Sequence, residues 1–222
     1  MPMHDWSRVE SGLYHHFHQY WAVAICDVLN GGLLPSGFSA LIERHSDNQE
    51  PEPFQPRIES FAARGNRIAI RHRMMKLVCV IELVSPGNKH SRSSIRQFVD
   101  KAVGFLRSGV HLLILDPFPP SPRDPQGIHK AIFDEIEKID FRLPADQPLT
   151  LAAYEADIEG FGLNVTAYVE PIGVGTTLPD MPAYLDLDEY VAVPLESTYQ
   201  LAWANCPPDM RVLVETGKLR EE

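Results

Sequence analysis

The sequence predicts a single α/β domain over all 222 residues, built on a mixed sheet of roughly five or six strands. Residues 77–84 and 110–115 are almost wholly apolar, which is typical of strands covered on both faces. Between them, apolar side chains recur every three or four positions over residues 93–107, which predicts a helix. A strand, a helix and a second strand in this order predict two parallel strands joined by a crossover helix.

The residues before this unit predict a first helix and further strands. Helical spacing of apolar side chains runs over residues 11–30 and stops at a glycine pair. Residues 38–44 have the alternation of a strand. The acidic, proline-marked stretch 46–56 predicts a surface loop. Two short alternating segments predict a hairpin that turns around Arg64-Gly65-Asn66: 57–63 and 67–72.

Residues 119–222 are expected to form an extension that packs on the core of residues 1–118. Asp124 and Pro125 suit the start of a helix, which would carry isoleucines along one side. The segments that follow predict, in order, a strand, a polar turn, a strand, irregular chain and a closing helix: 149–154, 155–162, 163–170, 171–193 and 194–205.

Net charge, cysteine content and the length of apolar runs limit the partners and the cellular compartment that we expect. The net charge of −10 opposes a protein that coats nucleic acid without sequence preference. The three cysteines, Cys26, Cys79 and Cys206, form no CxxC pair, and buried, reduced thiols fit a cytoplasmic protein. No apolar run reaches the length of about 18 residues that a membrane span requires, and the first residues do not resemble a secretion signal. We therefore expect a cytoplasmic protein with no membrane contact.

Glu82 is the candidate site residue that the strand pattern singles out. It is the single charge of residues 77–84 and shares a face with Val80 and Val84. A carboxylate in such a strand must be ion-paired, hydrogen-bonded or bound to a metal, because desolvating it alone is costly. The strand ends soon after Glu82, at the edge where ligands bind in open α/β sheets. A ligand site and a simple salt bridge to a nearby Arg or Lys both remain open.

Several stretches of the sequence together resemble a known family. The stretches are VIELVSPGNK at 80–89, FVDK at 98–101, GVHLLILD at 109–116, HDW at 4–6, GLYHHFHQ at 12–19, PPSPRDPQGIHKA at 119–131, PLTLAAY at 148–154, LPDMP at 178–182 and PLESTY at 194–199. They resemble a bacterial family of unknown function, domain of unknown function four thousand and fifty-eight. Its core is similar to the PD-(D/E)xK, restriction-endonuclease-like fold. The resemblance implies a restriction-endonuclease-like mixed sheet flanked by helices, with a C-terminal extension of strands and helix.

The resemblance also implies a reaction and a set of catalytic residues. In such nucleases an Asp and a Glu from neighbouring strands hold Mg²⁺, which activates water, while a lysine orients the nucleophile. Glu82 would be the second carboxylate. Val84 stands where the lysine is expected, so the lysine would come from the following helix as Lys101, with Lys89 as the second choice. This gives the hypothesis of Mg²⁺-dependent phosphodiester hydrolysis.

The first acidic ligand is the weak point of that hypothesis. The related family usually carries a Pro-Asp strand before the hairpin, and no Pro-Asp occurs between residue 38 and Glu82. Glu43 or Glu59 would have to replace it, although a shift of one residue in register turns a side chain to the other face. The alternative is a non-catalytic binding or assembly module on a degenerate endonuclease-like fold. Nucleic acid, a protein partner and a second copy of the chain are the partners left open.

Other residues are expected around the same cleft. His15 and His18 are spaced to share one helix face, where they could bind metal, face Glu82 or form a polar surface. Ser85 and Asp116 follow or end the two apolar strands, and Asp116 could reach the cleft or end its strand in a turn. Basic side chains also cluster on both sides of Glu82, within 64–76 and 89–101, where they could attract phosphate groups.

Overall fold

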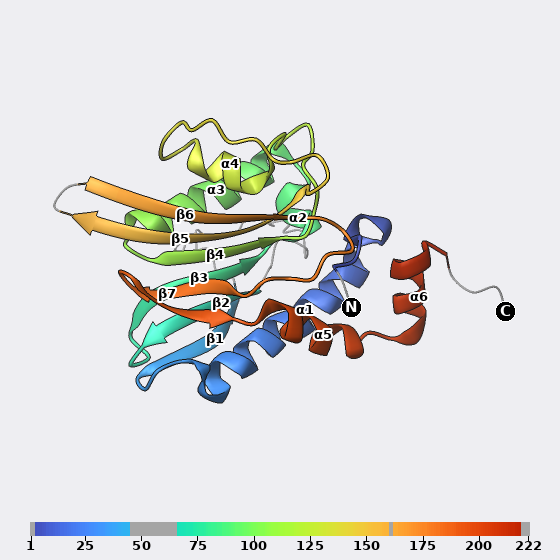
Figure 1. Ribbon diagram of the computed structural model, residues 1–222, viewed down its shortest axis with the longest axis horizontal. Helices are drawn as coiled ribbons and strands as arrows, with labels where there is room; N and C mark the ends of the chain where they lie inside the picture. Colours follow the sequence, from blue (N-terminus) through green and yellow to red (C-terminus); the bar gives the residue numbers. More distant parts are fainter. Residues whose placement is uncertain (1–2, 45–65, 160–161, 219–222) are drawn as a thin grey trace, which may run out of the picture.

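A computed structural model describes residues 3–44, 66–159 and 162–218 and contains one six-stranded sheet with the spatial order β1-β2-β3-β4-β5-β6 (Figure 1). The strands are β1 (Phe38–Arg44), β2 (Asn66–His72), β3 (Lys76–Leu83), β4 (His111–Asp116), β5 (Leu149–Glu159) and β6 (Gly162–Ile172). Only β3 and β4 pair in parallel; the other neighbours are antiparallel. The predicted α/β class with a mixed sheet is therefore confirmed.

The parallel pair lies at the centre of the sheet because its residues are apolar on both faces. All of β4 is buried, and β3 is buried from Val78 onward. The register places Glu82 beside Ile114. Between the two strands the chain forms the predicted crossover helix, whose apolar stripe faces the sheet. The order of strand, helix and strand predicted for residues 77–115 is confirmed.

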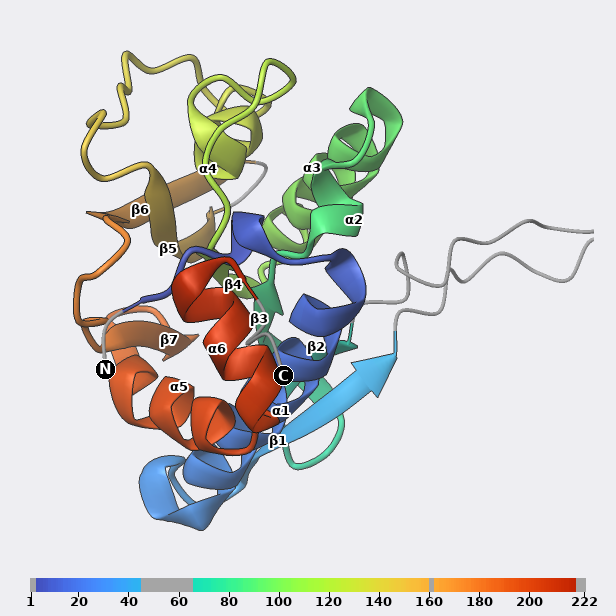
Figure 2. The ribbon, with the colours of Figure 1, turned by 90° about the vertical axis from the view of Figure 1, so that its right-hand side faces the viewer.

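The sheet has different partners on its two faces. Figure 2 shows α3 on one side and β7 and α5 on the other. The helices are η1 (Trp6–Arg8), α1 (Ser11–Val28), η2 (Leu29–Leu33), α2 (Pro86–Lys89), α3 (Arg92–Arg107), α4 (Gly127–Phe133), α5 (Leu195–Ala204) and α6 (Pro208–Thr216). The helix α1 packs along α5 and contacts β1 and β2. None of the helices in the described part of the chain combines the length and apolarity that crossing a membrane requires.

Three predictions for the second half of the chain are wrong. Residues 171–193 are not irregular, because β7 (Met181–Asp186) and β8 (Glu189–Val193) form an antiparallel hairpin over β3, β4 and β5. Burial against the sheet stabilises β7 despite its proline. Residues 155–162 are not a polar turn, because β5 runs to Glu159 and pairs with β6, which begins at Gly162. The helix α4 begins at Gly127 rather than after Asp124, whose side chain is used elsewhere.

Other predictions differ in their limits or cannot be compared with the structure. The first helix ends at Val28 and continues as a wider turn over η2, where Gly32 has a φ of 123° that favours glycine. The helix α6 was not predicted from the sequence. The loop 46–56, the segment 57–63 and the turn at Arg64-Gly65 lie outside the described residues.

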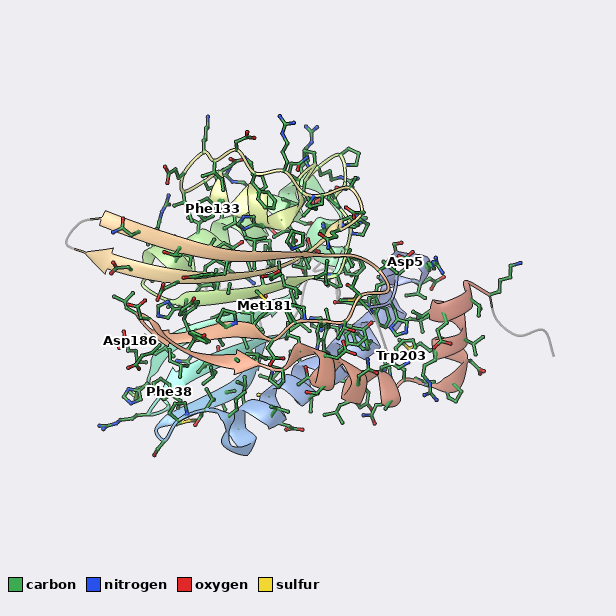
Figure 3. All side chains as sticks on the ribbon, viewed as in Figure 1. Asp5, Phe38, Phe133, Met181, Asp186 and Trp203 are labelled. Atoms are coloured by element: carbon green, nitrogen blue, oxygen red, sulfur yellow. The ribbon has the colours of Figure 1, made fainter. Side chains whose placement is uncertain are left out.

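An aromatic cluster joins the N-terminal segment to α1 and α5. Trp6 contacts Tyr14 and Phe17 of α1 and Trp203 of α5, with ring centroids 5.3, 4.3 and 5.9 Å apart. The hydroxyl of Tyr199 accepts hydrogen bonds from the Trp6 indole N–H at 3.0 Å and from a backbone N–H of the N-terminal segment at 3.2 Å. Figure 3 shows Trp203 at this end of the molecule, far from Asp186.

Candidate functional site

Glu82 lies on β3 next to the strand's last residue, and its side chain is only 9% exposed. Lys101 of α3 places its ammonium group 2.7 Å from Glu82 Oε1. The same ammonium lies 5.3 Å from the centre of the Phe98 ring, one helical turn earlier. Lys101 therefore faces Glu82, and of the two alternatives left open for Glu82 by the sequence, a salt bridge to a basic side chain is present. The pair connects the centre of the sheet to the crossover helix.

Glu43 shares the α3 side of the sheet with Glu82 but binds other partners. Its carboxylate accepts from Arg67 at 3.0 Å and lies 2.7 Å from an Arg71 nitrogen. Burial raises the pKa of Glu43, but the hydrogen bonds and charges of these two arginines outweigh burial and hold the pKa below its usual value. Since β2 separates β1 from β3, the backbones that carry Glu43 and Glu82 lie about 10 Å apart.

Arg67 occupies the space between those two carboxylates. It pairs with Glu43 across the β1 and β2 register, and its guanidinium lies 5.1 Å from the centre of the Phe105 ring on α3. A planar guanidinium stacked on a ring and bonded to a carboxylate is held in place by both contacts. From the sequence, Arg67 belonged to a basic cluster, and its position beside Glu43 was not predicted.

Lys89 belongs to a separate, buried group of charges. Its ammonium lies 2.9 Å from Asp116 Oδ2 and 2.9 Å from Asp124 Oδ2, and it donates to the Phe118 carbonyl at 3.0 Å. Burial lowers the pKa of Lys89, but the two carboxylates outweigh burial and raise it. Burial raises the pKa of Asp116, and the Lys89 charge opposes this rise. The group fastens α2 to the chain that follows β4.

Asp124 is a member of this group that the sequence analysis assigned to another role. Its Oδ1 accepts from the Ser121 backbone N–H at 3.0 Å and from the Ser121 hydroxyl. The signal available in the sequence was an acidic residue inside a proline-marked turn, which is also the signal of a helix cap. The two roles are therefore not distinguishable by local pattern.

Ser85 and Asn88 close the turn that follows β3. The backbone N–H and the hydroxyl of Ser85 both donate to Asn88 Oδ1 at 2.8 Å, and Pro86 stands at the start of the short helix α2. Such reciprocal capping satisfies polar groups at a helix N-terminus. The Ser85 hydroxyl is therefore engaged in a cap rather than directed at Glu82.

His18 contacts the backbone of Leu83, the residue that follows Glu82. Its Nε2 is 3.1 Å from the Leu83 carbonyl oxygen, and its ring stacks on that of His15 with centroids 6.1 Å apart. Burial lowers the pKa of His18 to about 4, although the bond to Leu83 and the charge of Glu82 oppose this change. His18 is thus a neutral hydrogen-bond donor at the end of β3.

Buried histidines make the stability of the protein sensitive to acid. Burial lowers the pKa of His4, His18 and His129 from 6.5 to about 4. In the unfolded chain these rings take up a proton below pH of about 6.5, whereas the folded rings remain neutral down to about 4. Unfolding therefore binds protons in this range, and the free energy of unfolding should fall as pH falls, by up to about 1.4 kcal/mol per pH unit for each ring.

Urea denaturation at a series of pH values between about 4 and 6.5 measures this dependence. His129, whose Nδ1 lies 2.8 Å from the Tyr154 hydroxyl, gives the clearest variant because it is distant in sequence from the other two. His129→Gln should reduce the slope by the share of one ring. Stability that does not change over this pH range would contradict the assignment of neutral, buried rings.

The described residues do not form a complete set of metal ligands. Within residues 3–44, 66–159 and 162–218, no group of three or more His, Cys, Asp and Glu side chains lies close enough to hold a metal ion. Mg²⁺ prefers several oxygen ligands, and the carboxylates of Glu82 and Glu43 are each occupied by basic groups. Glu59 lies outside the described residues.

Comparison with known proteins adds no assignment. No family model, curated protein or solved structure matches the chain significantly. The resemblance to the bacterial family and to restriction-endonuclease-like proteins therefore stays a prediction, while the mixed α/β sheet flanked by helices is established by the structure.

Proposed function

We propose that this chain is a non-catalytic binding module built on a restriction-endonuclease-like core. One observation carries the proposal: the candidate residues Glu82, Lys101, Lys89 and Asp116 are already engaged in ion pairs, in two separate groups. Lys101 is ion-paired with Glu82, and Lys89 is ion-paired with Asp116 and also contacts Asp124. A carboxylate that is already paired with an ammonium must give up that contact before it can bind a cation.

In this proposal the Glu82 and Lys101 pair positions the crossover helix against the sheet. Lys101 is partly exposed at 20%, so the pair contributes a modest stabilisation. The pair also satisfies the one charge that β3 places among apolar residues. Its function is then structural, and the surface used for binding lies elsewhere on the module.

Mg²⁺-dependent phosphodiester hydrolysis is the second candidate. It is favoured by the 2.7 Å contact between Glu82 and Lys101, because a lysine beside a metal-binding carboxylate is the arrangement such nucleases use. The described residues supply Glu82 as a ligand and Lys101 as the group that would hold or orient water. Mg²⁺ would supply the Lewis acid, and a second acidic ligand would have to join Glu82.

Metal titration and cleavage assays distinguish the two functions. We expect that calorimetry with Mg²⁺ and Mn²⁺ detects no binding to the wild type, and that single-turnover assays detect no cleavage of single- or double-stranded DNA or RNA. A double-mutant cycle with Glu82→Gln and Lys101→Met should give a coupling energy of about 1 kcal/mol in urea denaturation. The cycle tests the structural role independently of any activity.

Three results together would replace this proposal with the nuclease. They are metal binding by the wild type, its loss in Glu82→Gln, and cleavage that follows metal occupancy. Lys101→Met is the matched control, because it should abolish cleavage while retaining metal binding if Lys101 acts on the nucleophile.

A further inference from the structure

A polar pocket lies at the end of the sheet where β3 and β4 begin. Its volume is about 250 Å³, and it is the space between these strands, the end of β5 and the end of β7. Glu82 lies near the opposite end of β3. Figure 3 shows Asp186, one of the lining residues, at the left end of the molecule, far from Asp5 and Trp203. The pocket is therefore separate from the candidate site described above.

His111 at the start of β4 is one of the residues that line this pocket. Its Nδ1 accepts a hydrogen bond from the Ala156 backbone N–H at 3.0 Å, so the proton of the neutral ring resides on Nε2. Burial lowers the pKa of His111, which keeps the ring neutral, although the nearby carboxylates of Glu155 and Asp186 oppose this effect. The His111 ring is part of the pocket wall, and Nδ1 is the nitrogen that bonds to the backbone.

Basic and acidic side chains from different strands line the pocket. Lys76 comes from β3, His111 from β4 and Asp157 from β5, and these three strands are neighbours in the sheet. Asp186 adds a second carboxylate from the end of β7. The donors therefore come from the central strands β3 and β4, whereas the carboxylates come from β5 and from β7, which packs over β3, β4 and β5.

The remaining wall is apolar. It contains aliphatic side chains from several elements: Val78, Ile158, Leu185 and Leu187. Ile158 and Leu187 are 48% and 46% exposed, which is high for large apolar side chains. A ligand that covers them would gain hydrophobic free energy in addition to its polar contacts.

Two turns at this end of the molecule are held in a conformation that L-residues rarely adopt. Arg73 and Met74, just before Lys76, have φ values of 48° and 60°, and Asp188, just after Leu187, has 58°. Among the described residues these are all the non-glycine positions with positive φ. Positive φ is what tight hairpin turns require, and these residues form the β2–β3 and β7–β8 turns that border the pocket. The Asp188 N–H donates to Glu155 Oε1 at 2.6 Å, which fixes the second turn.

We propose that this pocket binds a small zwitterion of the amino-acid type with an aliphatic side chain. Lys76 and the Nε2–H of His111 bind its carboxylate, and Asp157 and Asp186 bind its ammonium group. The aliphatic wall covers the side chain. The assignment deepens the proposed function by naming a ligand class for the binding module, and it involves none of the residues tested by metal binding and cleavage, so either proposal can fail alone.

Valine and its two single-charge analogues test the ligand class. Isobutylamine is valine without its carboxylate, and isovalerate is valine without its ammonium group. Calorimetry with the full chain should detect binding of valine, and each analogue should bind at least about tenfold more weakly because one set of charge-assisted hydrogen bonds is missing. Isobutylamine or isovalerate binding as tightly as valine would overturn the zwitterion assignment, and so would the absence of valine binding up to its solubility limit.

Variants on the two sides of the pocket test the location. Lys76→Met and Asp186→Asn should each weaken valine binding at least about tenfold. Lys138→Met and Asp180→Asn are matched controls at exposed positions outside the pocket, and they should leave valine binding unchanged. Thermal unfolding of all four variants reports whether each remains folded. Unchanged binding in both pocket variants would place the valine site elsewhere and overturn the proposal.

Discussion

Replacing Lys89 with methionine is expected to lower the free energy of unfolding by about 3–5 kcal/mol. The side chains of Lys89, Asp116 and Asp124 are 8%, 2% and 0% exposed. Methionine keeps much of the volume of lysine but leaves two buried carboxylates without a cation, and it removes the donor to the Phe118 carbonyl. Breaking a buried pair costs more than the pair contributes, because the remaining charge is desolvated and uncompensated.

Urea denaturation of the wild type and of Lys89→Met measures this loss. Lys101→Met is the matched control: it also removes an ammonium from a carboxylate, but its side chain is 20% exposed and water can replace it in part. The control should lose about 1 kcal/mol. Equal losses in the two variants would contradict the distinction between the buried group around Lys89 and the partly exposed pair at Glu82.

Trp6→Ala is expected to destabilise the protein by about 3–5 kcal/mol. Trp6 is 1% exposed, although it precedes the first long helix and belongs to a short helical turn near the N-terminus. Its removal leaves a cavity against Phe17 and Trp203 and takes away the donor to the Tyr199 hydroxyl. Met3 exchanges backbone hydrogen bonds with Gly175 and Thr176, so the chain just before Trp6 is also held in place.

Thermal and urea unfolding measure this effect, and two further variants separate its parts. Trp6→Phe keeps an aromatic ring but loses the indole N–H, and it should cost less than Trp6→Ala. Tyr190→Ala removes an aromatic side chain that is 57% exposed, and it should change the stability by less than about 1 kcal/mol. If Trp6→Ala were as mild as Tyr190→Ala, the N-terminal segment would not be part of the core.

Local pattern was sufficient for the central unit of the fold. The strands β3 and β4 are buried on both faces, so their apolar runs are nearly unbroken, and α3 shows a clear helical stripe. Both signals depend on neighbours within a few positions. The strand pattern also placed Glu82 near the end of its strand, whereas Lys101 was chosen from the resemblance to nucleases. The structure brings the two side chains together.

Local pattern failed where a segment is stabilised by distant contacts. The hairpin of β7 and β8 contains a proline and follows an irregular stretch, and it forms because β7 packs over β3, β4 and β5. In the same way, β5 and β6 continue through a polar stretch because they pair with each other over their whole length. Strand propensity depends on such context more than helix propensity does.

The candidate site shows the same division. Glu43 was a possible partner of Glu82 on the sequence, but the register of β1 and β2 gives it Arg67 and Arg71 instead. Lys89 follows β3, and its ion-pair partner could not be predicted from that position. The path of the chain after β4 brings Asp116 and Asp124 to it and removes it from Glu82.

The sequence by itself determined the class of the fold, the parallel central strands, the crossover helix and the placing of one charge among apolar residues. The spacing of apolar residues carries that information, because it depends only on positions that are close together in the chain. Only the tertiary structure decided which charges neutralise one another and where a pocket remains. Those outcomes depend on strand register and on packing between segments far apart in sequence, and a change of one residue in register reverses which side chains meet.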